Sequence, residues 1–300
     1  MIIVPQRILS ARVAAAVLAA CIFNVHGQSV NLAKDLNESV ASLNVSVKDF
    51  YGREVNGKVV VTQYKPNGDG PFPIAILNHG RGPDRAAVAR FRFTQPARYF
   101  VKRGFAVFAP TRIGYGEAGT QPDPEDSGIC KQKNFASMAQ VASTQILAVL
   151  EYAKQQTYAD PARVLLVGQS VGGYSTVASA ARNPPGLLAA INFAGGSGGD
   201  PVGHPGEPCQ SNKMEEMYAG FGTSAKVPML WVYTENDQYF SPKHSQAWHG
   251  AYVNAGGKAD FKLFPPFGKD GHKLFSAGVT TWEPVVSEFL DSHGFPAAPH

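Results

Sequence analysis

The sequence predicts an α/β fold in which a mostly parallel sheet is covered by helices on both faces. From residue 73 onward, short uninterrupted apolar runs alternate with stretches of helical periodicity. Uninterrupted runs are typical of strands buried on both faces, and regular alternation of strand and helix is typical of a parallel sheet. The runs are residues 74–77, 105–109, 164–167, 187–193, 229–233 and 261–264.

Composition supports a globular protein with a large core. Of the 300 residues, 44% are hydrophobic and 17% are charged, which fits one large domain or at most two small ones and excludes a disordered chain. The formal net charge is +4, and its charges are scattered rather than gathered into a basic stripe. We therefore expect no binding of nucleic acid.

The first 27 residues are predicted to be an export signal. Arg7 and Arg12 give a positive start, and residues 13–23 form an apolar run that is too short to span a bilayer. Residues 25–27 then offer a cleavage site before Gln28. Export through this signal predicts a periplasmic or secreted protein.

A second processing route remains open at the same end of the chain. Residues 18–21 resemble a bacterial lipoprotein box, in which residues 1–20 would be the signal and Cys21 would carry the lipid. Only this route predicts attachment to a membrane. On the first route, the exported part is a single domain over residues 28–300.

Two candidate strands precede the alternating region and would form an antiparallel edge of the sheet. They lie at residues 45–50 and 58–64, and turn-forming residues follow the second. The clearest helical pattern comes at the other end, where apolar side chains recur at i, i+3, i+4, i+7 and i+8. These side chains are Trp282, Val285, Val286, Phe289 and Leu290.

Two long loops, rich in glycine and proline, interrupt the compact pattern. They run over residues 113–134 and 195–214, and each follows a predicted strand, so both belong to the edge of the sheet where sites usually lie. On either route Cys21 cannot form a disulfide, because it is cleaved off or lipidated, and only Cys130 and Cys209 are left, one in each loop. An oxidising compartment then predicts a disulfide that joins the loops into one lid, and two separately buried thiols are the alternative.

The candidate nucleophile is Ser170, at the centre of a G-x-S-x-G motif. Residues 164–173 have the pattern of a strand, a tight turn and the start of a helix, which is called a nucleophile elbow. Glycines flank the serine because only small neighbours let the backbone pass beneath a hydroxyl held at the end of a strand. The helix is predicted to run from about residue 171 to 182 and to stop at residues 183–186.

Two further glycine motifs are given no chemical role. The segment 195–199 also matches G-x-S-x-G around Ser197, but the proline and glycine residues that follow cannot start a helix, so Ser197 is predicted to be a loop residue. The segment 114–119 matches G-x-G-x-x-G, yet a dinucleotide site needs a helix directly after it, and none is predicted. Since no metal-ligand spacing occurs either, we expect no cofactor.

A serine needs an acid and a base to become nucleophilic near neutral pH. In the chain order expected after a nucleophile elbow, the acid follows a later strand. Asp237 lies in the turn after the strand at residues 229–233 and is the candidate acid. Glu235 is the alternative, and both carboxylates could instead cap the helix that begins near Pro242.

His272 is the candidate base. It lies in a glycine-rich loop after the last predicted strand and before the closing helix, which is the place where the expected order puts the histidine. Four of the other histidines after the elbow are assigned to a surface helix and to the tail. They are His244, His249, His293 and His300.

Backbone amides are the candidate groups for stabilising an oxyanion. The N–H of Val171 directly follows the nucleophile at a helix N-terminus, and the N–H of Arg81 lies in the loop after the first central strand. The spacing permits these two roles. His79, in the same loop, is expected to support the loop rather than to react.

Together these segments resemble the dienelactone-hydrolase-like branch of the α/β-hydrolases and are similar to the catalytic domains of prolyl-oligopeptidase-type peptidases. The likeness covers about residues 71–290 and implies the α/β-hydrolase fold and the oxyanion roles of Val171 and Arg81. One departure matters, because dienelactone hydrolases proper use a cysteine where Ser170 stands. The likeness is carried by residues 77–82, 110–116 and 160–173, by Asp237 and by residues 270–272.

The function expected from these features is a serine hydrolase that cleaves a small-molecule carboxylic ester through an acyl-enzyme intermediate. A serine peptidase is an alternative, although the chain lacks room for the propeller that gates prolyl-oligopeptidase-type sites. A non-catalytic binding protein is another alternative, since a fold does not dictate function. Arg81 and Arg112 lie near the site and hint at an anionic substrate, unless they serve as ion-pair partners.

Overall fold

The computed structural model describes residues 31–119 and 123–296. The predicted signal and the Cys21 lipoprotein box therefore lie outside the described residues. The chain divides into two units, Met1–Asn31 and Leu32–His300, and the second unit holds the whole fold. Among the described residues, no helix is long and apolar enough to cross a membrane.

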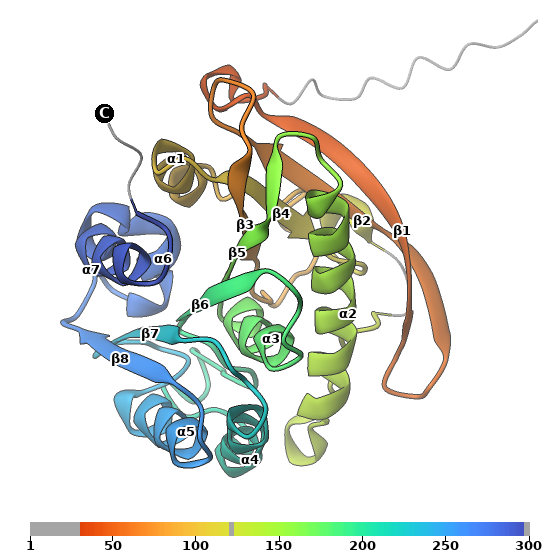
Figure 1. Ribbon diagram of the computed structural model, residues 1–300. Coiled ribbons are helices and arrows are strands. Elements are labelled where there is room, and N and C mark those ends of the chain that lie inside the picture. Colours follow the sequence, from red (N-terminus) through yellow and green to blue (C-terminus); the bar gives the residue numbers. More distant parts are fainter. Residues whose placement is uncertain (1–30, 120–122, 297–300) are drawn as a thin grey trace, which may run out of the picture. The chain divides into compact units, whose positions relative to one another are not determined.

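A single eight-stranded sheet forms the centre of the domain (Figure 1). The strand order is β1-β2-β4-β3-β5-β6-β7-β8, with β2 antiparallel to both β1 and β4 and all the other neighbours parallel. The predicted mostly parallel sheet with an antiparallel edge is thus confirmed. The strands are β1 Ser39–Lys48, β2 Glu54–Tyr64, β3 Phe72–Asn78, β4 Ala106–Thr111, β5 Ala159–Gln169, β6 Leu187–Phe193, β7 Met229–Thr234 and β8 Ala259–Phe264.

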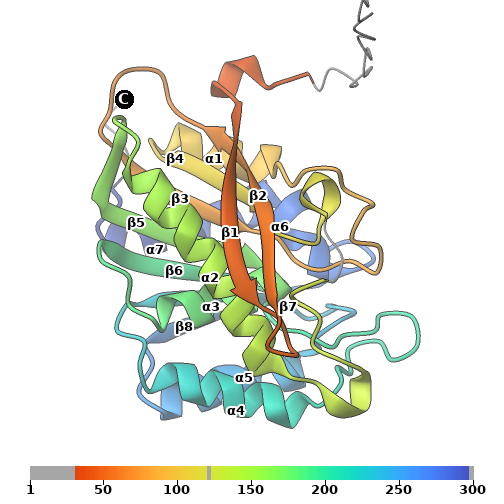
Figure 2. The same cartoon turned by 90° about the vertical axis from the view of Figure 1, so that its right-hand side faces the viewer.

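The first strand is longer than its sequence pattern indicates. It begins at Ser39 rather than at residue 45, because its first half pairs with β2 but stays largely exposed and so has no apolar run to mark it. It ends before Asp49, whose carboxylate accepts hydrogen bonds from the backbone N–H groups of Tyr51 and Arg53 and closes the turn. Figure 2 shows β1 and β2 as two long strands at this edge of the sheet.

Helices cover both faces of the sheet, as predicted. One face is covered by α2, α3, α4 and α5, and the other by α1, α6 and α7 (Figure 1). The helices are α1 Thr94–Lys102, α2 Phe135–Lys154, α3 Val171–Ala180, α4 Ser211–Gly222, α5 Pro242–Asn254, α6 Leu274–Ala277 and α7 Val279–Ser292, and the short 3-10 helices are η1 Lys34–Leu36, η2 Gly116–Ala118, η3 Cys130–Gln132 and η4 Gly271–Lys273.

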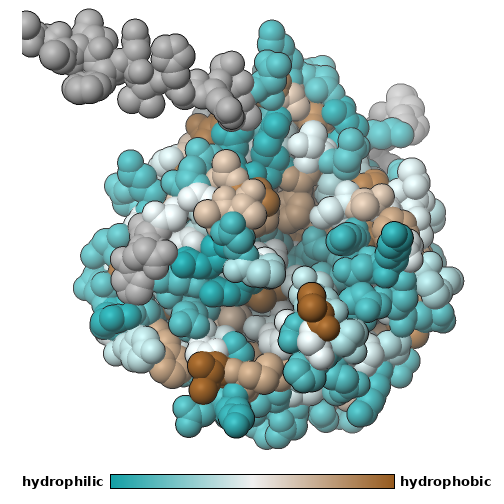
Figure 3. Space-filling model, turned by 180° about the vertical axis from the view of Figure 1, so that it is seen from behind, coloured by the Kyte–Doolittle hydropathy of each residue, from teal (hydrophilic) through white to brown (hydrophobic). Residues whose placement is uncertain are grey.

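Burial of both faces of β3 explains why the central strands consist of uninterrupted apolar residues. Ile74 and Ile76 belong to the cluster beneath α2–α5, whereas Ala75 and Leu77 belong to the cluster beneath α1, α6 and α7. Successive side chains of a strand point to opposite faces, so burial of both faces requires an apolar residue at every position. The face seen in Figure 3 is mostly hydrophilic with small, separated hydrophobic patches.

The parallel arrangement brings several chain segments to one edge of the sheet. The carboxyl ends of β3, β5, β7 and β8 lead directly into the segments that carry Arg81, Ser170, Asp237 and His272. The two long loops belong to the same edge. Helix α4 begins at Ser211, so the second loop is shorter than the predicted 195–214.

Candidate active site

Ser170 occupies a strained turn between β5 and α3. Its backbone has φ 58° and ψ −127°, a conformation with positive φ that non-glycine residues rarely adopt. The turn places the serine at the end of a buried strand and directly before the first helical residue, Val171. Such a geometry is characteristic of a nucleophile elbow.

Glycines beside Ser170 are required because other backbone segments pass very close to them. A Cβ atom on Gly168 would lie 2.1 Å from the carbonyl oxygen of Gly172, and one on Gly172 would lie 2.1 Å from the carbonyl oxygen of Asn78. Both contacts are with backbone and neither can be relieved by rotating a side chain. The two glycines of the motif therefore allow β3, β5 and α3 to meet beneath the serine.

Asp237 and His272 form a buried acid–base pair. Nδ1 of His272 lies 2.9 Å from Oδ2 and 3.1 Å from Oδ1 of Asp237. Oδ1 of Asp237 also accepts hydrogen bonds from the backbone N–H groups of Tyr239 and Phe240, at 2.8 and 3.0 Å. Because Nδ1 faces a carboxylate, it carries the proton, which leaves Nε2 of His272 as the basic nitrogen.

The alternatives for the acid are not favoured by the geometry. Glu235 is exposed and forms no hydrogen bond with His272 within the described residues. Capping of α5 is not the role of Asp237 either, since Ser241 is the N-cap residue of that helix. The carboxylate of Asp237 bonds instead to the backbone of its own turn and to the ring of His272. Asp237 is thus the carboxylate that the fold brings to the histidine.

The imidazole ring of His272 is fixed from several sides. The ring of Tyr239 stacks on it at 4.2 Å between centroids, and the ring of Phe240 meets it edge-on at 5.5 Å. The backbone N–H of His272 donates to Asp270, and its carbonyl accepts from the side chain of Gln169 at 2.6 Å. Tyr239 is a site residue that the sequence analysis missed, although its position two residues after Asp237 placed it in the same turn.

Ser170 and His272 line one cavity of about 530 Å³. No hydrogen bond joins their side chains in the described part of the chain. Catalytic hydrogen bonds are often long in the absence of substrate and shorten when it binds. The cavity therefore brings the serine and the histidine together without locking the hydroxyl in place.

The backbone N–H groups of Val171 and Arg81, near Ser170, have no acceptor within the described residues. Val171 is the first residue of α3, so its N–H has no acceptor within the helix. The N–H of Arg81 donates to no protein group among the described residues. The Arg81 loop lies against Ser170, because a Cβ atom on Gly80 would lie 2.7 Å from the Cβ and 3.3 Å from the Oγ of Ser170.

His79 supports this loop from inside the protein. Its Nδ1 donates to the carbonyl of Gly80 at 2.7 Å, its Nε2 accepts from the backbone N–H of Arg112 at 3.1 Å, and its ring stacks on Phe91 at 3.8 Å. Burial, reinforced by the positive charge of Arg112, holds the pKa of His79 well below its usual value. A neutral ring with one donor and one acceptor fits both hydrogen bonds.

Arg112 and Glu125 form a fully buried ion pair behind the same loop. Nε and Nη2 of Arg112 donate to the two carboxylate oxygens of Glu125 at 2.6 and 3.1 Å, and Nη1 donates to the carbonyl of His79 at 3.0 Å. Glu125 also accepts from the hydroxyl of Tyr115 and from the side chain of Gln145. The pair thus fixes the backbone of the loop that carries Arg81.

The hint of an anionic substrate drawn from two arginines is not supported by their contacts. Arg112 is fully buried and its charge is balanced by Glu125. Arg81 pairs with Asp123 at 2.5 Å and donates to the hydroxyl of Tyr115. Both arginines are therefore ion-pair partners, the second of the two interpretations that the sequence allowed.

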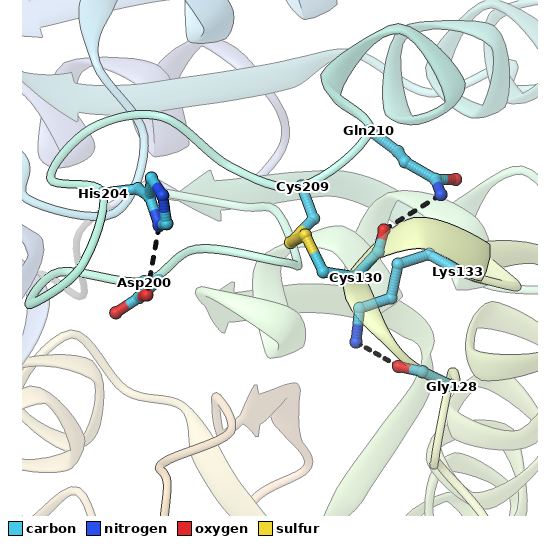
Figure 4. The surroundings of a disulfide bond; sticks show 7 residues. All are labelled: Gly128, Cys130, Lys133, Asp200, His204, Cys209 and Gln210. Carbon is cyan, nitrogen blue, oxygen red and sulfur yellow. Dashed lines mark hydrogen bonds and ion pairs between the residues drawn. A yellow bond between two sulfur atoms is a disulfide. The ribbon is translucent and has the colours of Figure 1, made fainter.

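The predicted disulfide joins Cys130 and Cys209, whose Cα atoms are 5.3 Å apart (Figure 4). It links η3 to the loop that precedes α4, across 79 residues of sequence. The backbone N–H of Cys209 donates to the carbonyl of Gly198, and the side chain of Gln210 donates to the carbonyl of Cys130. The bond therefore holds the 113–134 loop against the loop of Ser197.

Ser197 lies nearer to the site than its sequence context indicates. No helix follows it, as predicted, and it forms no hydrogen bond with a histidine among the described residues. Its side chain is nevertheless buried and lines a second cavity, of about 370 Å³, together with Ser170 and Val171. In the described part of the chain, no group of three or more His, Cys, Asp or Glu residues could hold a metal ion.

Solved structures of similar shape are esterases and peptidases. An esterase from Pyrococcus furiosus has 13% identity and a TM-score of 0.57, over 87% of this chain and 92% of that chain. An acetyl xylan esterase from Paenibacillus sp. R4 has 15% identity and a TM-score of 0.57, over 85% of this chain and 89% of that chain. A puromycin-hydrolyzing peptidase from Mycobacterium tuberculosis has 18% identity and a TM-score of 0.56, over 86% of this chain and 41% of that chain.

These likenesses show that the domain has the α/β-hydrolase fold. No curated protein matches the chain at a significant level. Residues 89–274 match the profile of the Dienelactone hydrolase family, and this segment begins shortly after the Arg81 loop and contains Ser170, Asp237 and His272. Since the matched segment covers more than half of the 300 residues, the chain belongs to the dienelactone hydrolase family.

Proposed function

We propose that the protein is a serine hydrolase that cleaves carboxylic esters through an acyl-enzyme intermediate at Ser170. The observation that carries the proposal is the shared cavity of a serine in a strained elbow and a histidine bonded to a buried aspartate. Membership of the dienelactone hydrolase family supports a hydrolase. The serine in place of the family's cysteine makes the base essential, because a hydroxyl ionises far less readily than a thiol.

In the first half-reaction, Oγ of Ser170 attacks the carbonyl carbon of the ester while Nε2 of His272 takes the hydroxyl proton. The negative oxygen of the tetrahedral intermediate accepts hydrogen bonds from the N–H groups of Val171 and Arg81. Asp237 stabilises the imidazolium that forms. The intermediate then breaks its bond to the alkoxide, which receives the proton from His272 and leaves as the alcohol.

In the second half-reaction, water replaces the alcohol. His272 takes a proton from the water, the resulting hydroxide attacks the acyl carbon, and the same two N–H groups stabilise the second tetrahedral intermediate. Its breakdown returns the proton to Oγ of Ser170 and releases the acid. The cycle consumes one water and needs no cofactor.

The test of this function is a panel of p-nitrophenyl esters of increasing acyl length, with a peptide anilide beside it. The proposal expects ester hydrolysis with an initial burst of p-nitrophenol, equal to about one per chain, because the acyl-enzyme accumulates when deacylation is slow. A peptidase, the second candidate because of the peptidase of similar fold, would prefer the anilide. Absence of turnover on every substrate would favour a binding protein.

We also propose that the protein is exported. The leader pattern in its first 27 residues and a disulfide within the folded domain both support an oxidising compartment. Mass spectrometry of the N-terminal peptide, from protein isolated in its natural host, tests this. A start at Gln28 or a lipidated Cys21 supports export, and an intact leader contradicts it.

A further inference from the structure

Two cavities meet at Ser170. The first, of about 530 Å³, contains His272 in its wall and is called here the His272 cavity. The second, of about 370 Å³, contains Val171 and is called here the Val171 cavity. Ser170, Arg81 and Tyr239 line both, so a substrate bound across the serine would place one part in each.

The chemistry of ester cleavage distinguishes the two cavities, on the basis of the proposed function. The leaving oxygen receives its proton from His272 and must therefore lie within hydrogen-bond reach of this residue. The acyl group stays on Ser170 while water takes the place of the alcohol beside His272. The alcohol part therefore belongs in the His272 cavity, and the acyl part belongs in the Val171 cavity.

The wall of the His272 cavity is mostly aromatic and aliphatic. Its side chains include Phe91, Phe93, Val88 and Ala87. The ring of Phe93 packs against Phe275 at 5.3 Å between centroids, and Phe91 is stacked on His79, so two walls of the cavity are fixed by the core. A rigid apolar wall of this kind binds an apolar or aromatic group better than a charged one.

The Val171 cavity is more polar than the His272 cavity, and its apolar lining includes Met138, Val202 and Phe240. Ser127, Ser197, Lys133 and Asp126 contribute polar or charged groups. Nζ of Lys133 donates to the carbonyl of Gly128 at 2.5 Å (Figure 4), and burial lowers the pKa of this lysine.

The polar side also extends beyond Ser170. A further cavity of about 490 Å³ shares Lys133, Gly198 and Asp200 with the Val171 cavity and is lined by Cys130 and Cys209. The disulfide thus forms part of the wall at the far end of the acyl side. A long acyl chain held in the Val171 cavity would therefore extend toward the disulfide.

We propose that the natural substrate is an ester that joins an apolar, aromatic alcohol, held in the His272 cavity, to an extended polar acid, held in the Val171 cavity. The assignment predicts two independent preferences. The identity of the alcohol affects only the acylation step, because the alcohol has left before water attacks. The identity of the acid affects both acylation and deacylation.

The first arm of the test compares methyl acetate with benzyl acetate, whose alcohols have similar acidities and whose acetyl-enzyme is the same. Alkaline hydrolysis of both esters gives the reference for intrinsic reactivity. We expect kcat/KM for the benzyl ester to exceed that for the methyl ester by about tenfold beyond this reference, as burial of one ring allows.

Phe93→Leu and Val88→Ser should reduce this preference for the benzyl ester and leave the deacylation rate unchanged. Val88 is 43% exposed, so its variant tests the assignment without disturbing the core.

The second arm compares benzyl hexanoate with benzyl adipamate, whose acids have equal chain length but an apolar or an amide-bearing end. We expect the adipamate to be preferred and Lys133→Met to reduce this preference while leaving the benzyl-over-methyl preference intact. If Phe93→Leu alters selectivity among acids and Lys133→Met alters selectivity among alcohols, the assignment of the cavities is reversed and the proposal is wrong. The proposal would also be overturned if every variant kept the selectivities among alcohols and among acids that the unmodified protein has. If the unmodified protein shows neither a burst nor reactivity at Ser170, the proposed function itself is rejected.

Discussion

The backbone of Ser170 is held in a conformation that a serine rarely adopts, and two close backbone contacts at its flanking glycines keep it there. A strained residue of this kind costs on the order of 1–3 kcal/mol and persists only where its surroundings impose it. Ser197 carries the same five-residue motif without this strain, since it is absent from the residues with positive φ among those described. The difference between the two serines therefore lies in context and not in local sequence.

Substitution separates the two serines. Ser170→Ala should lower kcat for a p-nitrophenyl ester by about 10⁴ or more, because only the oxyanion donors and binding remain. Ser197→Ala removes a hydroxyl from the wall of the Val171 cavity and should change kcat by less than about tenfold, with an effect on KM. Thermal melts of both variants serve as the folding control. Substantial activity in Ser170→Ala would reject the elbow assignment.

His79 makes the free energy of unfolding depend on pH, and its buried position beside Arg112 determines the direction. Its pKa is depressed in the folded state by burial and by Arg112, so the unfolded chain binds a proton more readily. The stability contributed by neutral His79 is therefore present above the unfolded pKa, near 6.5, and is lost as pH falls below it, by about 1.4 kcal/mol per pH unit. Urea unfolding at pH 7.5 and at pH 5 gives the loss of unfolding free energy between the two pH values. This loss should be smaller for His79→Gln than for the unmodified protein. Equal losses in both proteins would contradict the role assigned to this ring.

At the scale of elements, the buried pair of Arg112 and Glu125 connects the 113–134 loop and β4 to the Arg81 loop. We expect Glu125→Gln to destabilise the fold by about 3–5 kcal/mol, because it leaves the guanidinium buried without its counter-charge. It should also lower kcat more than it raises KM, because the Arg81 N–H acts mainly in the transition state. Glu151→Gln, which breaks an exposed ion pair on α2, is the matched control and should have neither effect.

The two consequences of Glu125→Gln can be separated by a double variant. Arg112→Met with Glu125→Leu removes both charges and should recover much of the lost stability, since an apolar pair can replace a buried ion pair. It also removes the hydrogen bond from Arg112 to the carbonyl of His79, so the defect in kcat should remain. Recovery of kcat together with stability would show that the pair has a structural role only.

The disulfide joins two loops that lie far apart in the sequence. Closing a loop of 79 residues stabilises a protein by about 4 kcal/mol in the chain-entropy model. The double variant Cys130→Ser with Cys209→Ser should lose a stability of this order in urea unfolding. Mass spectrometry of non-reduced peptides checks the bond itself. Two free thiols in protein from its natural compartment, or an unchanged midpoint in the variant, would contradict the prediction.

For the whole molecule, the sequence predicted those features that depend on periodicity and on chain order. The central strands were visible because burial on both faces demands apolar residues throughout, and the segments of Ser170, Asp237 and His272 were found because parallel strands end at one edge. The outer half of β1 was missed, because pairing with β2 alone leaves it exposed and without a pattern.

Features that depend on the path of a loop could not be predicted in the same way. No spacing in the sequence indicates that Glu125 reaches Arg112, that Tyr239 stacks on His272, or that Ser197 faces the cavity of Ser170. Each contact arises from how an irregular segment folds back over the sheet. For the same reason, the sequence could not decide between a substrate contact and an ion pair for Arg112, since its partner lies within such a segment.

The central claim, that Ser170 is the nucleophile activated by His272, is tested most directly by labelling with a fluorophosphonate probe followed by peptide mapping. The account predicts one adduct per chain, located on Ser170, with labelling lost in Ser170→Ala, greatly slowed in His272→Ala and unchanged in Ser197→Ala. An adduct on Ser197 or on any other residue, or no adduct in the unmodified protein, would contradict it.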